Sequence, residues 1–306
     1  MCRKCDRFFD YIDDRIEDGS LKPMVDCFNR LVAGLGNVLV YVVFIITLFL
    51  SFTSFAIMLP YEEQYKSPLT LTSLAVFGFY LLVNIMFHYI KARNTPPVLN
   101  PGTEGDPFCE RCNHWKSEKA HHCSVCNTCI LGMDHHCIWI NQCVGAHNHR
   151  HFFLFIASLT LACLVILIAG FNTLHDQIFL FSINDDAFCN VRLHYAPLQE
   201  YICEYNGFAK TSVLFCYMLG AVLFFMVGGL TAWNIYLISN GKTYIEHIAQ
   251  KKNQTKHLGW KRNFGANWRS FLGIRRSRPF WRIVLIPSTL PPITYESNSP
   301  GRYSVV

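Results

Sequence analysis

Four stretches of the chain contain no aspartate, glutamate, lysine or arginine: residues 31–61, 67–90, 152–174 and 211–241. Each is longer than the roughly 20 residues that a helix needs to cross a bilayer core of about 30 Å. The pattern therefore predicts four transmembrane helices and an all-α integral membrane protein. Because these stretches lack charged groups, an ion channel or proton-coupled transporter is disfavoured. Asn84 and His88, near the end of the second stretch, are expected to face neighbouring helices.

The composition agrees with a membrane protein, because 51% of the 306 residues are hydrophobic and only 16% are charged. A long charged segment precedes the first apolar stretch, which is also too long for the apolar part of a signal peptide. We therefore expect this stretch to be a membrane helix.

The distribution of lysine and arginine predicts the orientation of the helices. Six lie before the first helix, six between the second and third, and twelve after the fourth, whereas the two remaining loops hold three. Basic residues concentrate on the cytosolic side of membrane proteins. Both termini and the loop after the second helix should therefore be cytosolic.

These observations divide the chain into five parts. We expect a cytosolic N-terminal segment at 1–34, transmembrane helices 1 and 2 in 35–90, a cytosolic cysteine-rich domain at 91–151, helices 3 and 4 in 152–241, and a basic cytosolic tail at 242–306. The loop at 175–210 should be lumenal, and its Cys189 and Cys203 form either a disulfide or two free thiols in that oxidising setting.

The most informative stretch runs from Cys109 to Cys143 and holds seven of the fourteen cysteines. Six cysteines in closely spaced pairs, with two of the four nearby histidines, would fill two tetrahedral zinc sites. One cysteine is then left over, and Cys137 is the best candidate because it directly follows Asp134, His135 and His136. Spacing alone leaves the pairing open, since Cys123, Cys126 and Cys129 form overlapping pairs, and His121 or His135 could serve as a ligand.

A free cysteine beside a histidine and an aspartate has a known chemistry. Thiols attack as thiolates, and a neighbouring imidazole can take the thiol proton or stabilise the anion. His135 is expected to be that base for Cys137. An aspartate bonded to the other ring nitrogen orients the imidazole, and Asp134 fits this role.

The stretch, with the Asp134-His135-His136-Cys137 tetrad and Trp139, resembles the cysteine-rich domain of the DHHC-type protein S-acyltransferases (palmitoyltransferases), membrane enzymes that attach fatty acyl chains to cysteines of other proteins. The resemblance implies two structural zinc ions between helices 2 and 3. It assigns them two interleaved ligand sets: Cys109, Cys112, His122 and Cys129, and Cys123, Cys126, His136 and Cys143.

The same resemblance implies a two-step reaction in which Cys137 takes a long-chain acyl group from acyl-CoA, typically palmitoyl-CoA, and passes it to a substrate cysteine. Lys116 and Trp139 would contact the acyl carrier. The partners would be membrane-associated proteins with cytosolic cysteines, the lipid bilayer and acyl-CoA, without nucleic acid. We expect a multi-pass membrane protein of the endoplasmic reticulum or Golgi.

Two elements after the fourth helix resemble further motifs of this family. Residues 243–246 read Thr-Tyr-Ile-Glu where the family has T-T-x-E, and residues 263–268 match its aromatic and asparagine motif. Two positions depart from the family pattern: Ile138 replaces a proline, and residues 116–119 read Lys-Ser-Glu-Lys instead of K-P-x-R. Basic residues alternate with aromatic ones in the tail, which favours contact with an anionic leaflet over nucleic-acid binding.

Two other functions also use a cysteine-rich stretch of this kind. A membrane-anchored zinc scaffold would use the same ligands and leave Cys137 unreactive. A RING-type ubiquitin ligase also has interleaved zinc sites, but a closing C-x2-C pair is missing after His136, where only Cys143 follows. The H-E-x-x-H signature of zinc proteases is absent as well.

Overall fold

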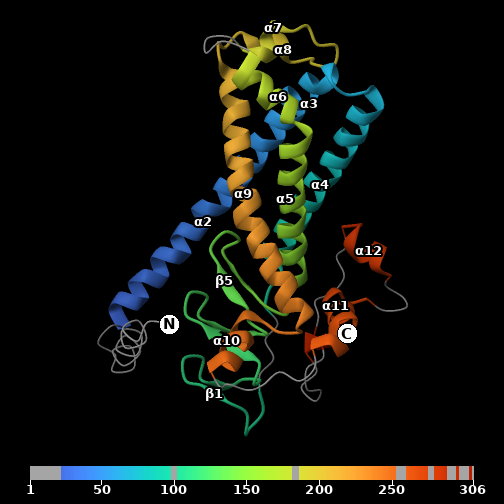
Figure 1. Ribbon diagram of the computed structural model, residues 1–306. Coiled ribbons are helices and arrows are strands. Elements are labelled where there is room, and N and C mark those ends of the chain that lie inside the picture. The colour runs from blue at the N-terminus through green and yellow to red at the C-terminus, as the bar shows by residue number, and fades with distance from the viewer. Residues whose placement is uncertain are drawn as a thin grey trace.

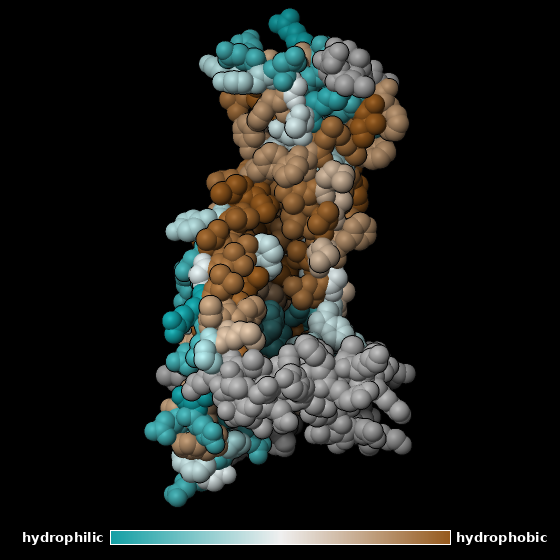
Figure 2. All heavy atoms as spheres, turned by 90° about the vertical axis from the view of Figure 1, so that its left-hand side faces the viewer, coloured by the Kyte–Doolittle hydropathy of each residue, from teal (hydrophilic) through white to brown (hydrophobic). Residues whose placement is uncertain are grey.

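The computed structural model describes residues 22–97, 102–180, 186–252, 260–274, 279–287, 294–295 and 303–304. Four helices within these ranges are long and apolar enough to cross a membrane, and they span Pro23–Gln64, Pro68–Asn94, His149–Ala169 and Phe208–Ser239. They stand side by side as a bundle (Figure 1) whose middle is covered by apolar side chains (Figure 2). The four long helices agree with the pattern, but the protein is mostly helical and not all-α, because the cysteine-rich segment between the second and third of them forms β-hairpins.

The first span is built from four consecutive helical segments. They are α2 (Lys22–Thr53), the π-helix η1 (Ser54–Met58), α3 (Leu59–Tyr61) and the 3-10 helix η2 (Glu62–Gln64). The helix begins well before the uncharged stretch. Asp26 and Arg30 lie within it, and their exposed side chains leave the helical backbone uninterrupted. The predicted segment 1–34 lies largely outside the described residues, together with Cys2 and Cys5.

The other three long helices are α4 (Pro68–Asn94), α5 (His149–Ala169) and α9 (Phe208–Ser239), and α5 packs against both α4 and α9. α4 begins with a helix-start signal, because the Ser67 hydroxyl accepts a hydrogen bond from Thr70 N and Pro68 occupies the first turn. Asn84 and His88 are buried in the bundle, and His88 Nδ1 lies 2.9 Å from His151 Nδ1 of α5. His88 therefore faces a neighbouring helix, as expected, whereas Asn84 donates to the Tyr80 carbonyl of its own helix.

Three small antiparallel hairpins follow α4 and precede α5 along the chain, and they lie at one end of the bundle (Figure 1). They pair β1 (Phe108–Cys109) with β2 (His114–Trp115), β3 (Ala120–Cys123) with β4 (Thr128–Leu131), and β5 (His135–Cys137) with β6 (Gln142–Val144). An asparagine with positive φ ends each tight turn: Asn113, Asn127 and Asn141. Asparagine tolerates this left-handed conformation better than most residues.

Short helices close the opposite end of the bundle: α6 (Phe171–His175), the π-helix η3 (Asp176–Leu180), α7 (Ala187–Asn190) and α8 (Gln199–Cys203). A disulfide joins Cys189 to Cys203. Buried Glu62 accepts hydrogen bonds from Asn172 and Thr173, which ties the first span to α6. The alternative left open by the sequence is thus resolved as a disulfide.

The described part of the C-terminal tail comprises α10 (Tyr244–Lys252), α11 (Trp260–Leu272), α12 (Phe280–Val284), and the paired strands β7 (Thr294–Tyr295) and β8 (Tyr303–Ser304). Phe271 and Ile283 form a buried apolar cluster with Phe153 and Leu154 of α5. The tail therefore packs under the same end of the bundle that carries the hairpins. Most of its basic residues lie outside the described side chains.

Candidate active site and metal centres

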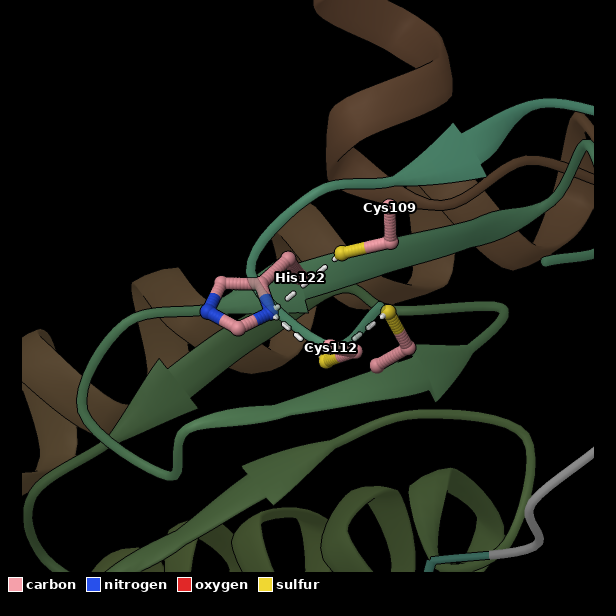
Figure 3. Close-up of side chains that lie close together, drawn as sticks. Cys109, Cys112 and His122 are labelled. Atoms are coloured by element: carbon pink, nitrogen blue, oxygen red, sulfur yellow. Dashed lines mark hydrogen bonds between the residues drawn. The ribbon is translucent and has the colours of Figure 1, made fainter. Parts of the chain in front are cut away.

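The first of two cysteine and histidine groups consists of Cys109, Cys112, His122 and Cys129, whose candidate ligand atoms all lie within 4.8 Å of one another. His122 Nδ1 is 3.7 Å from Cys109 Sγ and 3.2 Å from Cys112 Sγ (Figure 3). Cys129 Sγ is 3.6 Å from Cys112 Sγ. One hairpin supplies the first two cysteines, and the next supplies the histidine and the third cysteine.

The second group repeats this arrangement one hairpin further along. It consists of Cys123, Cys126, His136 and Cys143. His136 Nδ1 lies 3.7 Å from Cys123 Sγ, 3.4 Å from Cys126 Sγ and 3.6 Å from Cys143 Sγ. Both groups match the interleaved ligand sets that the resemblance implied, and His121 and His135 belong to neither.

Both groups have the geometry that a tetrahedral zinc ion requires. With Zn–S of about 2.3 Å and Zn–N of about 2.0 Å, a tetrahedral site should place nitrogen and sulfur about 3.5 Å apart and two sulfurs about 3.8 Å apart. The distances from Nδ1 to sulfur, 3.2–3.7 Å, lie close to the first of these values. Thiolate and imidazole are the donors that zinc prefers. The residues present therefore fit two metal ions.

The three hairpins form a repeat that the sequence analysis did not find. Their first cysteines, Cys109, Cys123 and Cys137, are spaced fourteen residues apart. Each pairs with the residue five positions later, namely His114, Thr128 and Gln142. The equal registers give three turns of the same form. The C-x2-C-N pattern at 109–113 and 123–127, followed by C-x2-I-N at 137–141, is the sequence signal for it.

Cys137 therefore occupies the position of a metal ligand in a turn that has no second cysteine. Ile140 stands where the other two turns have Cys112 and Cys126, and its side chain is fully buried in an apolar cluster. Cys137 is itself 8% exposed and belongs to neither metal group. The turn of the third hairpin thus presents one thiol, Cys137, that belongs to neither metal group among the described residues.

His135 is held by Asp134 on the same hairpin. His135 Nδ1 lies 2.9 Å from Asp134 Oδ2, and the Asp134 carboxylate is buried. Burial lowers the pKa of His135, but its interactions with Asp134 and Cys137 outweigh burial and raise this pKa to about 9. An imidazole placed between a carboxylate and a thiol can accept the thiol proton and remain protonated beside the thiolate.

The start of α10 contacts the other oxygen of Asp134. Thr243 Oγ1 accepts from the Glu246 amide at 3.3 Å, and Glu246 Oε2 accepts from the Thr243 amide at 3.0 Å, which is a capping box. The next amide, Tyr244 N, donates to Asp134 Oδ1 at 2.6 Å. Burial raises the pKa of Asp134, but its hydrogen bonds, chiefly with His135, hold it below the usual value. A helix N-terminus therefore helps to keep this carboxylate charged.

A cavity of about 710 Å³ extends from Cys137 and Trp139 into the helical bundle. Its walls come from the first span, α4, α5 and α9, and they are almost entirely apolar. It reaches Met58, Glu62 and Gly170 near the opposite end of the bundle. Trp139 lines the cavity and is 49% exposed, whereas Lys116 lies on the hairpin domain outside the cavity lining.

Comparison with known proteins agrees with this arrangement. A family model described as DHHC palmitoyltransferase matches residues 102–251. Palmitoyltransferase ZDHHC16A of Danio rerio is 32% identical over 313 residues, covering 90% of this chain and 81% of the relative. The chain belongs to the DHHC palmitoyltransferase family. Palmitoyltransferase ZDHHC16 of Homo sapiens is 30% identical over 295 residues, covering 90% of this chain and 78% of the relative.

Palmitoyltransferase PFA3 of Debaryomyces hansenii matches a shorter part of this DHHC protein: it is 31% identical over 203 residues that cover 60% of this chain and 44% of the relative.

The C-terminal elements that resembled the family are also placed by the structure. Asn267 Nδ2 donates to Ser239 O at 2.9 Å, and Trp268 Nε1 donates to Ser239 Oγ at 3.1 Å. They fasten α11 to the end of α9.

Proposed function

We propose that this protein, a protein S-acyltransferase by family, moves a long-chain acyl group from acyl-CoA to Cys137 and then to cysteines of other proteins. The observation that carries the proposal is the position of Cys137. Its thiol lines a deep apolar cavity and lies beside a histidine that is bonded to a buried carboxylate. A nucleophile, a base and a chain-binding cavity therefore meet at one point.

The first step is attack by the Cys137 sulfur on the thioester carbonyl of acyl-CoA. His135 takes the thiol proton, and Asp134 stabilises the imidazolium that results. A bond from the Cys137 sulfur to the acyl carbon forms, the bond from that carbon to the CoA sulfur breaks, and the CoA thiolate leaves with the proton from His135. The products are acyl-Cys137 and free CoA.

The second step reverses the roles of the two sulfurs. A substrate cysteine gives its proton to His135 and attacks the acyl carbon as a thiolate. A new thioester forms on the substrate, and the Cys137 thiolate departs and recovers the proton. No oxidant, reductant or further co-substrate is needed, because one thioester replaces another.

The cavity supports a long acyl chain as the transferred group. Its volume lies within the roughly 300–1,000 Å³ that ligand pockets usually have, and its lining offers an acyl chain almost only apolar contacts. Cys137 and Trp139 line the cavity from the hairpin domain at one end of the bundle, so the carrier would stay outside the bundle. Trp139 would contact the reacting end of acyl-CoA, and Lys116 would contact its anionic carrier from the hairpin domain.

Two zinc ions would be held by the two interleaved ligand sets. When bound, they supply structural stability to the hairpins, and binding energy of this kind contributes directly to folding. Neither set has an open position for a substrate, because each offers four protein ligands. The chemistry of acyl transfer is therefore assigned to Asp134, His135 and Cys137.

The proposed orientation places both termini and the hairpins in the cytosol. The uneven distribution of basic residues supports it, and so does the disulfide at the opposite end of the bundle, since disulfides persist in oxidising compartments. The substrates would be membrane-associated proteins with cytosolic cysteines, in the endoplasmic reticulum or Golgi. Tags near the termini and in the 94–107 linker should be cleaved by protease added from the cytosolic side.

The decisive experiment is the intact mass of the purified protein after incubation with palmitoyl-CoA, before and after hydroxylamine. The protein should gain one palmitoyl group that hydroxylamine removes. Cys137→Ser should keep both zinc ions and gain no acyl group, because a serine hydroxyl ionises far less readily than a thiol. A normal acylation rate in Cys137→Ser would place the nucleophile elsewhere, and loss of zinc would make Cys137 a ligand and favour the scaffold.

A further inference from the structure

The turn that follows Cys137 is held in place without a metal ion. In the other two hairpins, both cysteines of the turn belong to a metal group. In the third, Ile140 replaces the second cysteine and packs with Val40 of α2 and with Ile85 and Tyr89 of α4. Membrane helices therefore contact this turn at the position where the other turns would contact zinc.

α4 holds the backbone of the same turn. The Tyr89 hydroxyl donates to the Trp139 carbonyl at 2.9 Å, and Arg93 NH1 lies 3.5 Å from the Ile140 carbonyl. Gln142, the first residue of β6, donates through Nε2 to the Arg93 carbonyl at 3.2 Å. The end of α4 thus fixes one side of the turn.

α2 fixes the other side through an unusually close approach. Asn141 Nδ2 donates to Asn37 Oδ1 at 2.9 Å. A Cβ atom built on Gly36 would lie 2.3 Å from Asn141 Oδ1, 2.6 Å from its Cγ and 3.0 Å from its Cβ. A rotation of the Asn141 side chain cannot relieve the last contact, because the backbone fixes the Cβ position. Only glycine lets α2 approach the turn this closely.

We infer that Gly36 is a positioning residue for acyl transfer: the contact between α2 and Asn141 sets where Cys137 lies relative to the acyl cavity. The inference rests on the proposed function of Cys137. It follows from the position of α2, whose Val43, Thr47 and Leu50 line the cavity only a few turns beyond Gly36. One helix therefore forms a wall of the cavity and a support for the nucleophile.

The chain offers a matched control on the same helix. Gly34 lies two residues before Gly36, and no heavy atom in the described part of the chain lies within 4 Å of a Cβ built on it. Alanine should raise helix propensity equally at both positions. Any difference between Gly34→Ala and Gly36→Ala therefore reports the contact with Asn141 and not the stiffness of α2.

A second substitution tests whether the contact itself is responsible. Asn141 has φ 48°, which glycine adopts without strain, so Asn141→Gly should keep the turn and remove the side chain that Gly36→Ala would strike. The four proteins of this cycle are wild type, Gly36→Ala, Asn141→Gly and the double variant. Each is purified in full length, and its zinc content, its melting temperature, and the kcat and KM of Cys137 acylation with alkynyl palmitoyl-CoA are measured.

Displacing a reacting atom by about 1 Å commonly costs about 100-fold in rate. Gly36→Ala should therefore lower kcat by about 10- to 100-fold, with zinc content and melting temperature preserved and KM changed less than about twofold. Gly34→Ala should keep the wild-type kcat. In the Asn141→Gly background, adding Gly36→Ala should cost less than about threefold, because the clash is gone.

Three results would overturn the positioning role while Cys137→Ser remains inactive. These are a wild-type kcat in Gly36→Ala, an equal loss in Gly34→Ala, or an equal loss of kcat on adding Gly36→Ala in both Asn141 backgrounds. Normal acylation of Cys137→Ser would overturn the proposed function itself, and the positioning role with it. The two failures are therefore distinguished by one additional variant.

Discussion

The backbone amide of Tyr244 donates a hydrogen bond of 2.6 Å to Oδ1 of Asp134, although the two residues lie 110 positions apart. The other carboxylate oxygen, Oδ2, faces His135 Nδ1 at 2.9 Å. The carboxylate is thus held between a helix start after the last membrane helix and the imidazole beside Cys137. The C-terminal tail takes part in the site through a main-chain atom, so the tyrosine that replaces the usual threonine does not remove this contact.

Replacing Tyr244 by proline should isolate this hydrogen bond. Tyr244 is the first residue of α10, where proline fits a helix but has no amide proton. A hydrogen bond to a charged group contributes about 1.5–3 kcal/mol, so acylation of Cys137 should slow by about tenfold or more. Tyr244→Ala keeps the amide and should react at nearly the wild-type rate. The rates are measured with a fluorescent acyl-CoA. Equal rates in the two variants would show that this hydrogen bond does not contribute to acylation.

The two metal groups should differ in their importance for the nucleophile. Cys112→Ala removes a ligand from the first metal group, which is the more distant of the two from Cys137 in the sequence. One zinc ion and part of the acylation activity should therefore remain. Cys143→Ala removes a ligand from the group that contains His136, so it should lower both zinc content and acylation. Elemental analysis and the acylation assay check this, and an unchanged zinc content in either variant would contradict the ligand assignment.

Filling the cavity should discriminate between long and short acyl chains. Leu159 lines the cavity, whereas Leu161 is two residues further along α5, is 41% exposed and lies outside the lining. Leu159→Trp should slow acylation by palmitoyl-CoA at least about tenfold while acetyl-CoA reacts as before, because only the long chain needs the occupied volume. Leu161→Trp should change neither rate. A similar loss with both acyl donors would indicate a distorted site instead of a blocked cavity.

Removing the disulfide should destabilise the end of the bundle opposite the hairpins. Cys189 and Cys203 enclose a loop with a sequence separation of 14 residues, for which a disulfide contributes about 3 kcal/mol. Cys189→Ser should lower the melting temperature by several degrees and leave two zinc ions bound. Exposed Cys27 provides the control, since Cys27→Ser should melt like the wild type. Identical melting curves for all three proteins would contradict the expectation.

Much of the architecture could be predicted because its signals are local. Uncharged stretches of sufficient length predicted the four long helices, and the C-x2-C spacing predicted two metal groups. The start of α2 at Lys22 could not be predicted from the uncharged stretch. The stretch begins only after Asp26 and Arg30, whereas the helix continues through both residues. A hydropathy pattern indicates where a helix meets lipid and not where its hydrogen bonds end.

The contacts that complete the site are not local, and this is why they were missed. Nothing in the sequence around Gly36 shows that Asn141 lies against it, and Tyr244 reaches Asp134 through an amide that every residue except proline has. Spacing also could not pair the metal ligands, and the hairpin registers are what bring His122 opposite Cys129 and His136 opposite Cys143. The fourteen-residue repeat was present in the sequence but is obscured by Ile140.

The repeat shows what distinguishes the third turn from the two before it. Ile140 stands where they have their second cysteine, so Cys137 occupies a ligand position whose partner is apolar. A cysteine placed there would give Cys137 a chelating companion, and thiophilic ions such as cadmium would then compete with an acyl donor for the same sulfur. On the proposed function, the reactivity of Cys137 would thus depend on a side chain that takes no part in the reaction and denies metal ions a second ligand.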